Sequence, residues 1–552
     1  MIPTVPADFA GADLVWLLDL TWGGRAYRLA TRPVDLLDAD GASVAYSGGL
    51  EEPEWEESLD RLSTSTDGQS VAIEVTLQVD VATVRRQGHD LTAATATLAY
   101  VLDVGGTIGQ TWERRYVVLA GRVVQPQYGH PERVQGWLAF SLEERPYDDR
   151  ARVIPGSWRV TDTTWPNRHA DALNEPYPLV FGTPGIYRST AGDSYTTGAP
   201  ALAVVVSGGT TTKLLVAGGD VRAATVRVYD ADGNGYTGTV VQEADGLGQR
   251  VATVDVSAAP APFDATGSTY VVTWGYSSAS GGARNPYRVS SERTGAGDVC
   301  RWMLSRSTID VDTGRWAAVA PALNRYLLSG YVNDPDATPW EWLADNVLPL
   351  LPLTIRRGPD GLYPVLAHLD AREVDAVPVR AGPAFRRSSP VMVDGTVQDV
   401  INAARLDYVL SEQAGTYKRF ARIDPAAYDA QTTAETGLGT SLAARVSQAR
   451  YGVQMEWSAT SDIVYDVATA QRIVSDKVRL NALLAESVEY EADVTWGWLT
   501  VGRTLSLTDD DADDGIALTD RVCVVDGRRW TGTGWRFRVV LDEDLARDAR
   551  ST

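Results

Sequence analysis

The chain has 552 residues, of which 44% are hydrophobic and 22% charged, and its formal net charge is −22 at pH 7. A chain of this length is expected to form roughly three to five domains, and this composition can bury real cores, which excludes a disordered protein. The acidic balance argues against binding of a phosphate backbone, because such binding requires clustered cations.

The cysteines and the apolar segments indicate the cellular compartment in which the chain is expected to fold. Cys300 and Cys523 form no CxxC motif and no Cys/His cluster, so we expect two free thiols in a reducing cytoplasm. The N-terminal segment has no basic stretch followed by a long apolar core, and nowhere do about 18 uncharged apolar residues run together. We therefore expect neither a signal peptide nor a membrane span.

Residues 1–150 are predicted to form an antiparallel β-barrel or sandwich. The clearest strand is Val71–Asp80, in which large apolar side chains alternate with polar ones. A short helix is expected at Val81–Gln87. Further strands, separated by turns that contain Gly or Asp, are expected at Thr92–Leu102, Arg115–Val124 and Val134–Leu142.

Residues 151–200 are rich in Pro, Gly, Trp and Tyr without clear periodicity, and we expect a connecting segment that lies along other domains. Residues 201–290 predict a small β-domain, possibly an insertion. Its expected strands are Ala203–Val206, Lys213–Val216, Thr225–Tyr229, Thr237–Gln242, Val251–Val256 and Thr269–Thr273.

Residues 291–420 predict an α+β domain. Thr338, Pro339 and Glu341 form a capping box with Pro at the first helical position, so a helix is expected to start there and to end before Pro349. The other expected elements are a hairpin of Leu353–Arg357 and Leu362–Leu366, a second helix at Val397–Ala404 and a strand at Asp407–Leu410.

Residues 421–552 predict a C-terminal β-barrel that carries one long helix, at about Ile463–Leu480. The helix presents Val467, Ala470, Val474 and Val478 on one side. The expected strands are Val488–Val494, Leu499–Leu507, Arg521–Val525 and Trp535–Leu541. The whole chain is thus predicted to be mainly β with an α+β unit, divided among several domains.

No catalytic motif is found. The four histidines form no HExxH or other metal-ligand spacing, and the P-loop and GxSxG motifs are absent. Asp230–Gly235 matches the first half of a calcium loop, but Val241 stands where a bidentate Glu is required, so a hairpin turn is the alternative. The acidic run Asp509–Asp514 is either a solvated loop or a cation site. We expect no enzyme activity, no cofactor and no metal.

The strand Val488–Val494 has one apolar side and one acidic side, which consists of Glu489, Glu491 and Asp493. Alternation forces these three carboxylates onto the side opposite Tyr490 and its apolar neighbours. One interpretation is an ordinary solvated sheet surface. The other is a negatively charged wall of a channel, facing the lumen and repelling DNA that passes through it.

The segment Ala449–Leu541 resembles the C-terminal part of the tail hub proteins of long-tailed bacteriophages. The residues that carry the resemblance are the Tyr451-Gly452 step before a strand, the helix with Ala468-Thr469-Ala470, and the run Leu499-Thr500-Val501-Gly502 that leads to Leu507-Thr508-Asp509. The helix at Trp340 and the hairpin with Gly361-Leu362-Tyr363 resemble the α+β domain of that family. Residues 1–150 are similar in general pattern to tail-tube-like barrels. Arg503 departs from the family, in which Asp usually follows the Val-Gly turn.

This resemblance implies a structural protein of the virion, located at the tail tip or baseplate after assembly in the host cytoplasm. It implies a homotrimer with two barrel-like domains per subunit, which adapts a six-fold tail tube to a three-fold tip and forms part of the DNA channel. The implied partners are the distal-tail ring protein, the tape-measure protein and tail-tip or fibre proteins. The 17 Trp and 23 Tyr, against 7 Phe, suit sheet surfaces and subunit interfaces.

Three other functions are compatible with parts of the sequence. A virion-associated cell-wall hydrolase could hold its catalytic carboxylates among the 72 acidic residues. A hexameric distal-tail protein would be structural too, with a different stoichiometry. A β-rich carbohydrate-binding protein would use exposed Trp side chains. The long helix and the α+β unit argue against the last two.

Overall fold

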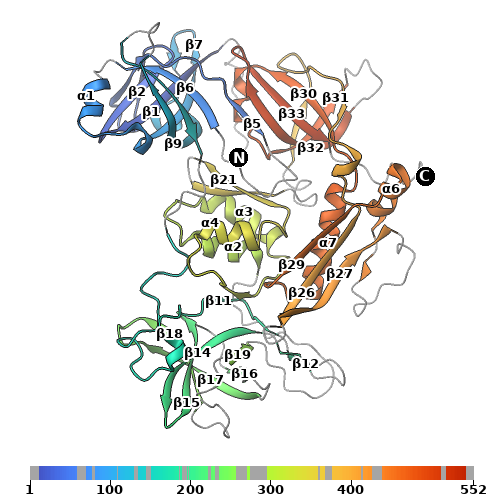
Figure 1. Cartoon of the computed structure of the whole chain (residues 1–552). Helices are drawn as coiled ribbons and strands as arrows, with labels where there is room; N and C mark the ends of the chain where they lie inside the picture. Colours follow the sequence, from blue (N-terminus) through green and yellow to red (C-terminus); the bar gives the residue numbers. More distant parts are fainter. Residues whose placement is uncertain are drawn as a thin grey trace.

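The fold is taken from a computed structural model of the whole chain (Figure 1). The residues that it describes are 12–541 without 59–69, 78–80, 109, 130–134, 145–150, 186, 189–194, 197, 220, 222–224, 230–234, 257–269, 274–294, 359–360, 367–375, 412–414, 426–437, 440 and 511–517. The predicted fold class is confirmed: the protein is mainly β, with several sheets and an α+β part. None of the described helices is both long enough and apolar enough to cross a membrane.

The N-terminal sheet has the strand order β3-β4-β2-β1-β7-β9-β10-β6, and β8 pairs with β7. Along β1, Trp16, Leu18 and Leu20 point into the main core, whereas Val15 and Leu17 pack under the β3–β4 hairpin on the other side. Its elements are β1 Asp13–Trp22, β2 Arg25–Ala30, β3 Val34–Leu37, β4 Ser43–Gly48, β6 Ser70–Thr76, α1 Val81–Arg86, β7 Thr95–Val104, β8 Thr107–Ile108, β9 Tyr116–Tyr128 and β10 Trp137–Glu143.

The chain after β4 draws the two sides of this sheet toward each other. Leu50 N donates to Ala30 O at 3.2 Å, and Thr76 N donates to Gly49 O at 2.7 Å, so the segment bridges β2 and β6. Gly49 has φ +127°, and a Cβ there would lie 2.4 Å from Thr76 O, so only glycine fits. The sheet is therefore barrel-like.

The C-terminal sheet has the order β23-β31-β32-β33-β30-β24, with β25 also on β30 and β5 on β32. A tight turn connects its two edge strands: Gly382 N donates to Phe385 O at 2.9 Å, and Phe385 N donates back at 3.1 Å. Its elements are β5 Glu56–Ser58, β23 Val377–Arg380, β24 Phe385–Arg387, β25 Met392–Val393, β30 Glu486–Ala492, β31 Thr504–Asp509, β32 Leu518–Trp530 and β33 Trp535–Leu541.

The small β-domain is a closed barrel of six strands in the order β14-β15-β18-β17-β16-β19, at the opposite end of the molecule from the two large sheets (Figure 1). All six of its strands overlap the predicted ones. Its strands are β14 Ala199–Ser207, β15 Thr210–Gly218, β16 Thr225–Tyr229, β17 Gly235–Ala244, β18 Arg250–Asp255 and β19 Tyr270–Thr273.

The connecting segment packs along two domains. Val160, Trp165 and Tyr177 cover the outside of the small barrel, whereas Val153 and Phe181 belong to the core of the α+β part. It includes the short strand β11 Val180–Phe181, which pairs with β20 Gly330–Tyr331. A further two-stranded pair, β12 Tyr187–Arg188 and β13 Tyr195–Thr196, precedes the barrel.

The α+β part contains two groups of elements around one core. The first group consists of α2 Ala296–Leu304, α3 Thr313–Leu323, α4 Pro339–Asn346 and the hairpin β21 Leu353–Gly358 and β22 Gly361–Leu366. The second group is a sheet in the order β28-β27-β26-β29 with two helices, and comprises β26 Ala403–Ser411, β27 Thr416–Ile423, β28 Leu438–Gly439, α6 Leu442–Tyr451, β29 Glu456–Ser461 and α7 Val467–Asn481.

The predicted boundary between residues 420 and 421 cuts through this sheet, because β27 spans Thr416–Ile423. The long helix α7 packs on β26 and β27, not on the C-terminal sheet to which the sequence assigned it. Conversely, β23, β24 and β25 belong to the C-terminal sheet although they precede the boundary. The chain passes from the C-terminal sheet to this sheet between Val393 and Ala403, and it returns between Asn481 and Glu486, so neither passage lies at residue 421.

The expected helix Val397–Ala404 is wrong. The chain makes one 3-10 turn at Val397–Asp399, with Thr396 and Asp399 as its capping pair, and enters β26 at Ala403. Pairing of β26 with both β27 and β29 overrides the helix propensity of the two alanines. Three helices, α2, α3 and α6, are absent from the prediction. In the first two, Gly297, Gly314 and Pro321 interrupt the sequence pattern.

The capping box of α4 is confirmed and allows a direct test of stability. Thr338 Oγ1 accepts from Glu341 N at 3.2 Å, and Thr338 N donates to Glu341 Oε2 at 2.8 Å. We expect Thr338→Ala to lower the free energy of unfolding by about 1 kcal/mol, because it leaves a helix N–H without its partner. Thr338→Ser keeps the oxygen and should retain most of the stability in the same denaturant titration. Equal losses in both variants would contradict the role of the cap.

Candidate functional site

The residues that the structure describes contain no cluster of potential metal ligands. No group of three or more His, Cys, Asp or Glu side chains in that part of the chain could hold a metal ion. Residues 230–234 and 511–517, which contain most of both acidic loops, lie outside the described residues. Cys300 and Cys523 are both buried, and burial raises the pKa of Cys300 to about 12, so its thiol is not a nucleophile near neutral pH.

The side chains predicted to face a channel lie on or next to β30. Glu489 and Glu491 alternate with Val488 and Tyr490, which are both fully buried, so the predicted alternation holds for these two glutamates. Asp493 lies beyond the end of β30, where it caps the 3-10 turn η7 Val494–Trp498 and accepts from Thr495 N at 2.9 Å. We call the surface around Glu489 and Glu491 the polar face of β30.

Arginines from the neighbouring strands neutralise this face. Glu491 Oε1 lies 2.7 Å from Arg536 of β33, and Glu491 Oε2 lies 3.5 Å from Arg386 of β24. Arg538 of β33 is directly opposite Glu489 in the ladder. The polar face of β30 therefore has mixed charge: two arginines contact Glu491, and Arg538, opposite Glu489, forms ion pairs with Asp394 and Asp526.

The pairing at Glu491 predicts how the face responds to charge reversal. The hydrogen bond from Arg536 lowers the pKa of Glu491, so the stabilisation is present above the carboxyl's ordinary pKa and is lost as the pH falls through the lowered value. We expect Glu491→Lys to lower the melting temperature at pH 7 more than Glu491→Gln, because lysine would face two arginines. The difference should shrink in high salt, which screens exposed charges. Equal melting temperatures at low salt would contradict this role of Glu491.

The two large sheets are joined by a strand that crosses between them. The chain leaves the N-terminal sheet after β4, and β5 then adds to β32 of the C-terminal sheet, with Glu57 opposite Arg528 (Figure 1). Trp530 N donates to Trp55 O at 3.0 Å and extends this pairing. The connection is thus part of the C-terminal sheet itself.

A buried ion cluster fixes this crossing. Glu57 Oε2 lies 2.6 Å from Arg528 Nε, and Glu57 Oε1 lies 3.1 Å from Arg356 Nη1 of β21. The three side chains are 5%, 6% and 10% exposed. Arg356 also donates to Ser58 O, and Arg528 donates to Gly497 O at 3.0 Å. One carboxylate therefore ties together the N-terminal chain, the C-terminal sheet and the hairpin of the α+β part.

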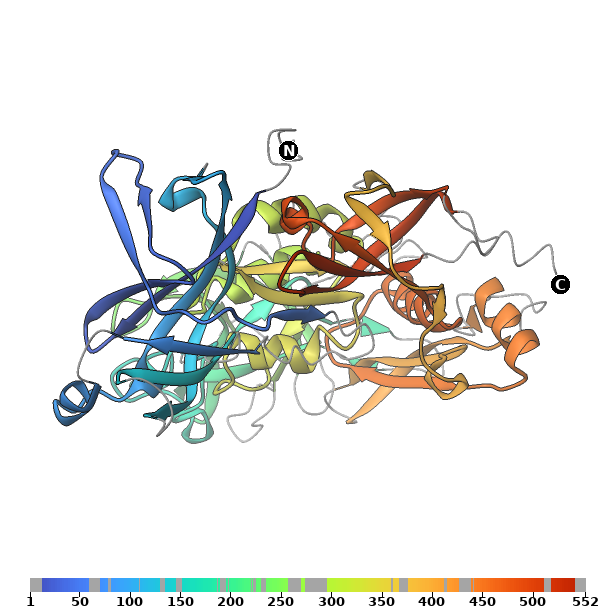
Figure 2. The ribbon, with the colours of Figure 1, turned by 90° about the horizontal axis from the view of Figure 1, so that it is seen from above.

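Aromatic side chains surround this cluster and form the centre of a core shared by both sheets. The Trp535 ring lies 5.7 Å from Trp55, 5.6 Å from Tyr100 and 6.4 Å from Trp16, measured between ring centroids. The Arg528 guanidinium lies 4.5 Å from the Trp55 ring, a cation–π distance. Figure 2 shows the two sheets side by side from above, with the yellow elements of the α+β part between and below them.

We call the crossing strand β5 and its ion cluster of Glu57, Arg356 and Arg528 the junction. The junction predicts that substitutions of two adjacent glutamates will differ greatly in their effect on stability. Glu57→Ala would leave two buried guanidinium groups without their carboxylate, and we expect it to cost about 3–5 kcal/mol of unfolding free energy. Glu56, its neighbour on β5, is exposed, and Glu56→Ala should change stability by about 0.5 kcal/mol or less. Denaturant unfolding followed by Trp fluorescence reports on this site directly. Similar losses in both variants would show that the cluster does not hold the junction.

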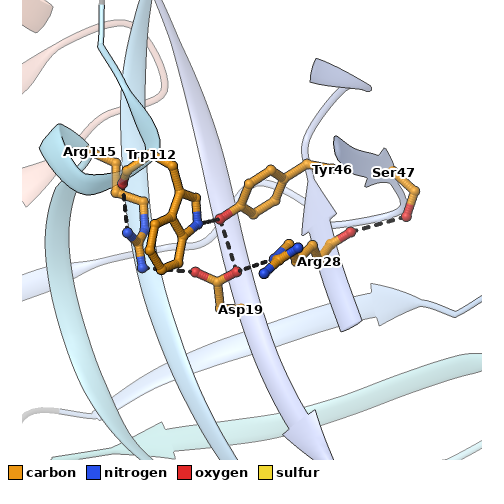
Figure 3. A network of polar contacts seen from close by, with 6 residues as sticks. All are labelled: Asp19, Arg28, Tyr46, Ser47, Trp112 and Arg115. Carbon is orange, nitrogen blue, oxygen red and sulfur yellow. Dashed lines mark hydrogen bonds and ion pairs between the residues drawn. The ribbon is translucent and has the colours of Figure 1, made fainter. Parts of the chain in front are cut away.

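A second polar network attaches the β3–β4 hairpin to the N-terminal sheet (Figure 3). Asp19 of β1 accepts from the Tyr46 hydroxyl at 2.9 Å and from Arg115 Nη2 at 3.0 Å, while Trp112 Nε1 donates to the Tyr46 oxygen at 3.0 Å. Burial and the nearby Asp19 raise the pKa of Tyr46 well above its ordinary value. Asp19 accepts hydrogen bonds from both Tyr46 and Arg115, and this arrangement fixes the position of the hairpin. The polar groups of the network are thus occupied by one another.

The sequence analysis did not find the residues of either network. Glu57, Arg356 and Arg528 are far apart in the chain, and no local spacing connects them. The one local indication is the pair Trp530 and Trp535 around a Gly-containing turn, because adjacent strands place such tryptophans opposite each other.

No protein-family model matches this sequence, and no curated protein does. Solved structures align over nearly the whole chain. They include a tail protein from Neisseria meningitidis (10% identity, 96% of this chain and 97% of that chain, TM-score 0.35) and a prophage tail protein from Listeria monocytogenes (6%, 94% and 99%, 0.34). A 43 kDa tail protein of a Shewanella oneidensis prophage aligns at 10% identity over 96% and 98% of the two chains, with TM-score 0.29.

Proposed function

We propose that this chain is a structural component of a bacteriophage tail, and within the tail its hub. The observation that carries the proposal is the joining of two barrel-like sheets in one chain by a shared core and a crossing strand. Three such chains would supply six barrel-like units, the number needed to continue a six-fold tube into a three-fold tip. The resemblance of residues 449–541 to tail hub proteins supports the same role. The aligned solved proteins are tail proteins too, but at these TM-scores the proposal rests on the fold and the sequence.

As a hub, the trimer would contact the distal-tail ring protein, the tape-measure protein and tail-tip or fibre proteins, and would reside in the virion. DNA would pass through its channel without specific binding, for which the net charge of −22 is suited. In this proposal the polar face of β30 and Asp493 point toward the channel. Since Arg386, Arg536 and Arg538 balance the glutamates, the repulsion of DNA must come from other carboxylates around the lumen.

The proposal includes no enzymatic role. The junction and the Asp19 network are polar sites whose charged groups are mutually paired.

Copy number and symmetry in the particle test the hub directly. We expect a ring of three chains in a cryo-EM reconstruction of the tail tip, and no clearing when the purified chain is run in a peptidoglycan gel. A six-fold ring would contradict the hub proposal and would support a distal-tail protein instead. Clearing of peptidoglycan by the wild-type chain would favour the cell-wall hydrolase, and a single copy per virion would exclude both ring proteins.

A further inference from the structure

Three exposed apolar side chains follow one another closely at one edge of the C-terminal sheet. Met392 and Val393 of β25 and Val397 of the next 3-10 turn are 36%, 61% and 38% exposed, respectively. Other exposed large hydrophobic side chains, such as Leu37 and Leu247, are far from them in the sequence. We call the surface of Met392, Val393 and Val397 the β25 patch. Exposed apolar groups that are concentrated in this way are typical of a surface that a protein partner covers.

Hydrogen bonds on both sides hold the β25 patch in place. β25 pairs with the first residues of β30, and Asp394 N donates to Ala485 O at 2.8 Å. In the turn, the Asp399 carboxylate accepts from Thr396 N at 2.6 Å and from the Thr396 hydroxyl at 2.9 Å. Because the backbone around the three apolar side chains is fixed, docking of a partner on them would cost little ordering entropy.

The β25 patch lies away from the N-terminal sheet of its own chain. In the C-terminal sheet, β5 pairs with β32 on one side of β33, whereas β25 pairs with β30 on the other side. Ile401 N, just after the turn, donates at 2.7 Å to Asn481 O at the end of α7. Figure 1 shows α7 on the side of the molecule remote from the N-terminal sheet. The N-terminal sheet of the same chain therefore does not cover the patch.

The far end of the N-terminal sheet carries a group of exposed arginines. α1 lies at the end of that sheet remote from the C-terminal sheet (Figure 1), and its last turn contains the exposed Arg85 and Arg86. The β1–β2 turn, which leads to the exposed Arg25, lies against His89, because a Cβ on the first glycine of the turn would be 2.9 Å from the His89 ring. We call the surface of Arg25, Arg85 and Arg86 the α1 end. Asp90 is its acidic neighbour, so the surface is mainly cationic.

The rim of the β25 patch has the opposite charge. Glu486 is opposite Val393 in the ladder, and the exposed Asp399 follows the last residue of the patch by two positions. Asp394 is also at this rim, but Arg538 lies 2.7 Å from it and neutralises it. Arginine suits such a surface, because its aliphatic stem packs on apolar groups while its guanidinium pairs with carboxylates. An apolar centre with a polar rim is the usual composition of a protein interface.

We propose that the β25 patch of one copy of this chain receives the α1 end of a second copy. The inference rests on the proposed function, because it takes the chains to form a closed ring in which N-terminal and C-terminal sheets alternate. Within one chain the junction already joins the two sheets, so the contacts between chains use the remaining end of each sheet. The two surfaces are different, which makes the contact heterologous, and a heterologous contact repeated around an axis closes a ring.

Sedimentation of the full native chain over a range of concentrations tests the contact. We expect Val393→Asp to raise the concentration of half-assembly about tenfold or more, because assembly would bury a carboxylate beside Glu486. Arg85→Glu at the α1 end should weaken assembly in the same direction. Leu247→Asp is the matched control: Leu247 is 58% exposed on the turn before β18 of the small barrel, and its replacement should change the midpoint by about twofold or less.

A photo-crosslinking amino acid in place of Val393 identifies what lies against the β25 patch. We expect crosslinked dimers on a denaturing gel, and mass spectrometry should map the crosslinks to peptides that contain Arg25 or Arg85. The same amino acid in place of Leu247 should give no such dimers.

The number of copies in the ring reports on the hub, whereas the variants report on the contact. An unchanged midpoint for Val393→Asp, as when another tail protein covers the patch, would overturn the contact and leave a three-copy hub intact. Crosslinks from position 393 to a part of the second copy away from the α1 end would also overturn it. So would a wild-type chain that stays monomeric up to about 100 µM. A six-copy ring that Val393→Asp disrupts would keep the contact and contradict the hub.

Discussion

The architecture depends on one carboxylate that is buried between two guanidinium groups. A charged cluster in this position is costly to desolvate, and further contacts offset that cost: each arginine also donates to a backbone oxygen, and the Arg528 guanidinium lies over the Trp55 ring. The geometry has a specific effect: Glu57 can satisfy Arg356 and Arg528 together only when both large sheets and the β21–β22 hairpin occupy one arrangement. Tryptophans from both sheets then close around the cluster and exclude water.

Elements with a strong local pattern could be predicted from the sequence. Turn residues and alternation within short windows predict the strand β33 and the six strands of the small barrel, and the local capping residues predict the start of α4. The assignment of elements to domains could not be predicted in the same way. Both β5 and β23–β24 pair with strands that lie more than a hundred residues further along the chain, and such pairing leaves no periodic trace in the sequence.

The polar face of β30 shows that the sequence pattern is also limited in what it predicts for single residues. Alternation alone places Glu489 and Glu491 on one side of a strand, and the structure agrees. Their charge environment is decided by β24 and β33, whose arginines come into register only when the ladder forms. A strand read in isolation therefore gives the orientation of a side chain but not the electrostatic potential around it, which belongs to the sheet.

The small barrel illustrates how weakly one domain can be coupled to the rest of a chain. It has its own core, and the connecting segment packs along its outside, while β11 of that segment pairs with β20 of the α+β part. Residues in this barrel can therefore change, or the barrel can be exchanged for another of similar width, without altering the packing around Glu57.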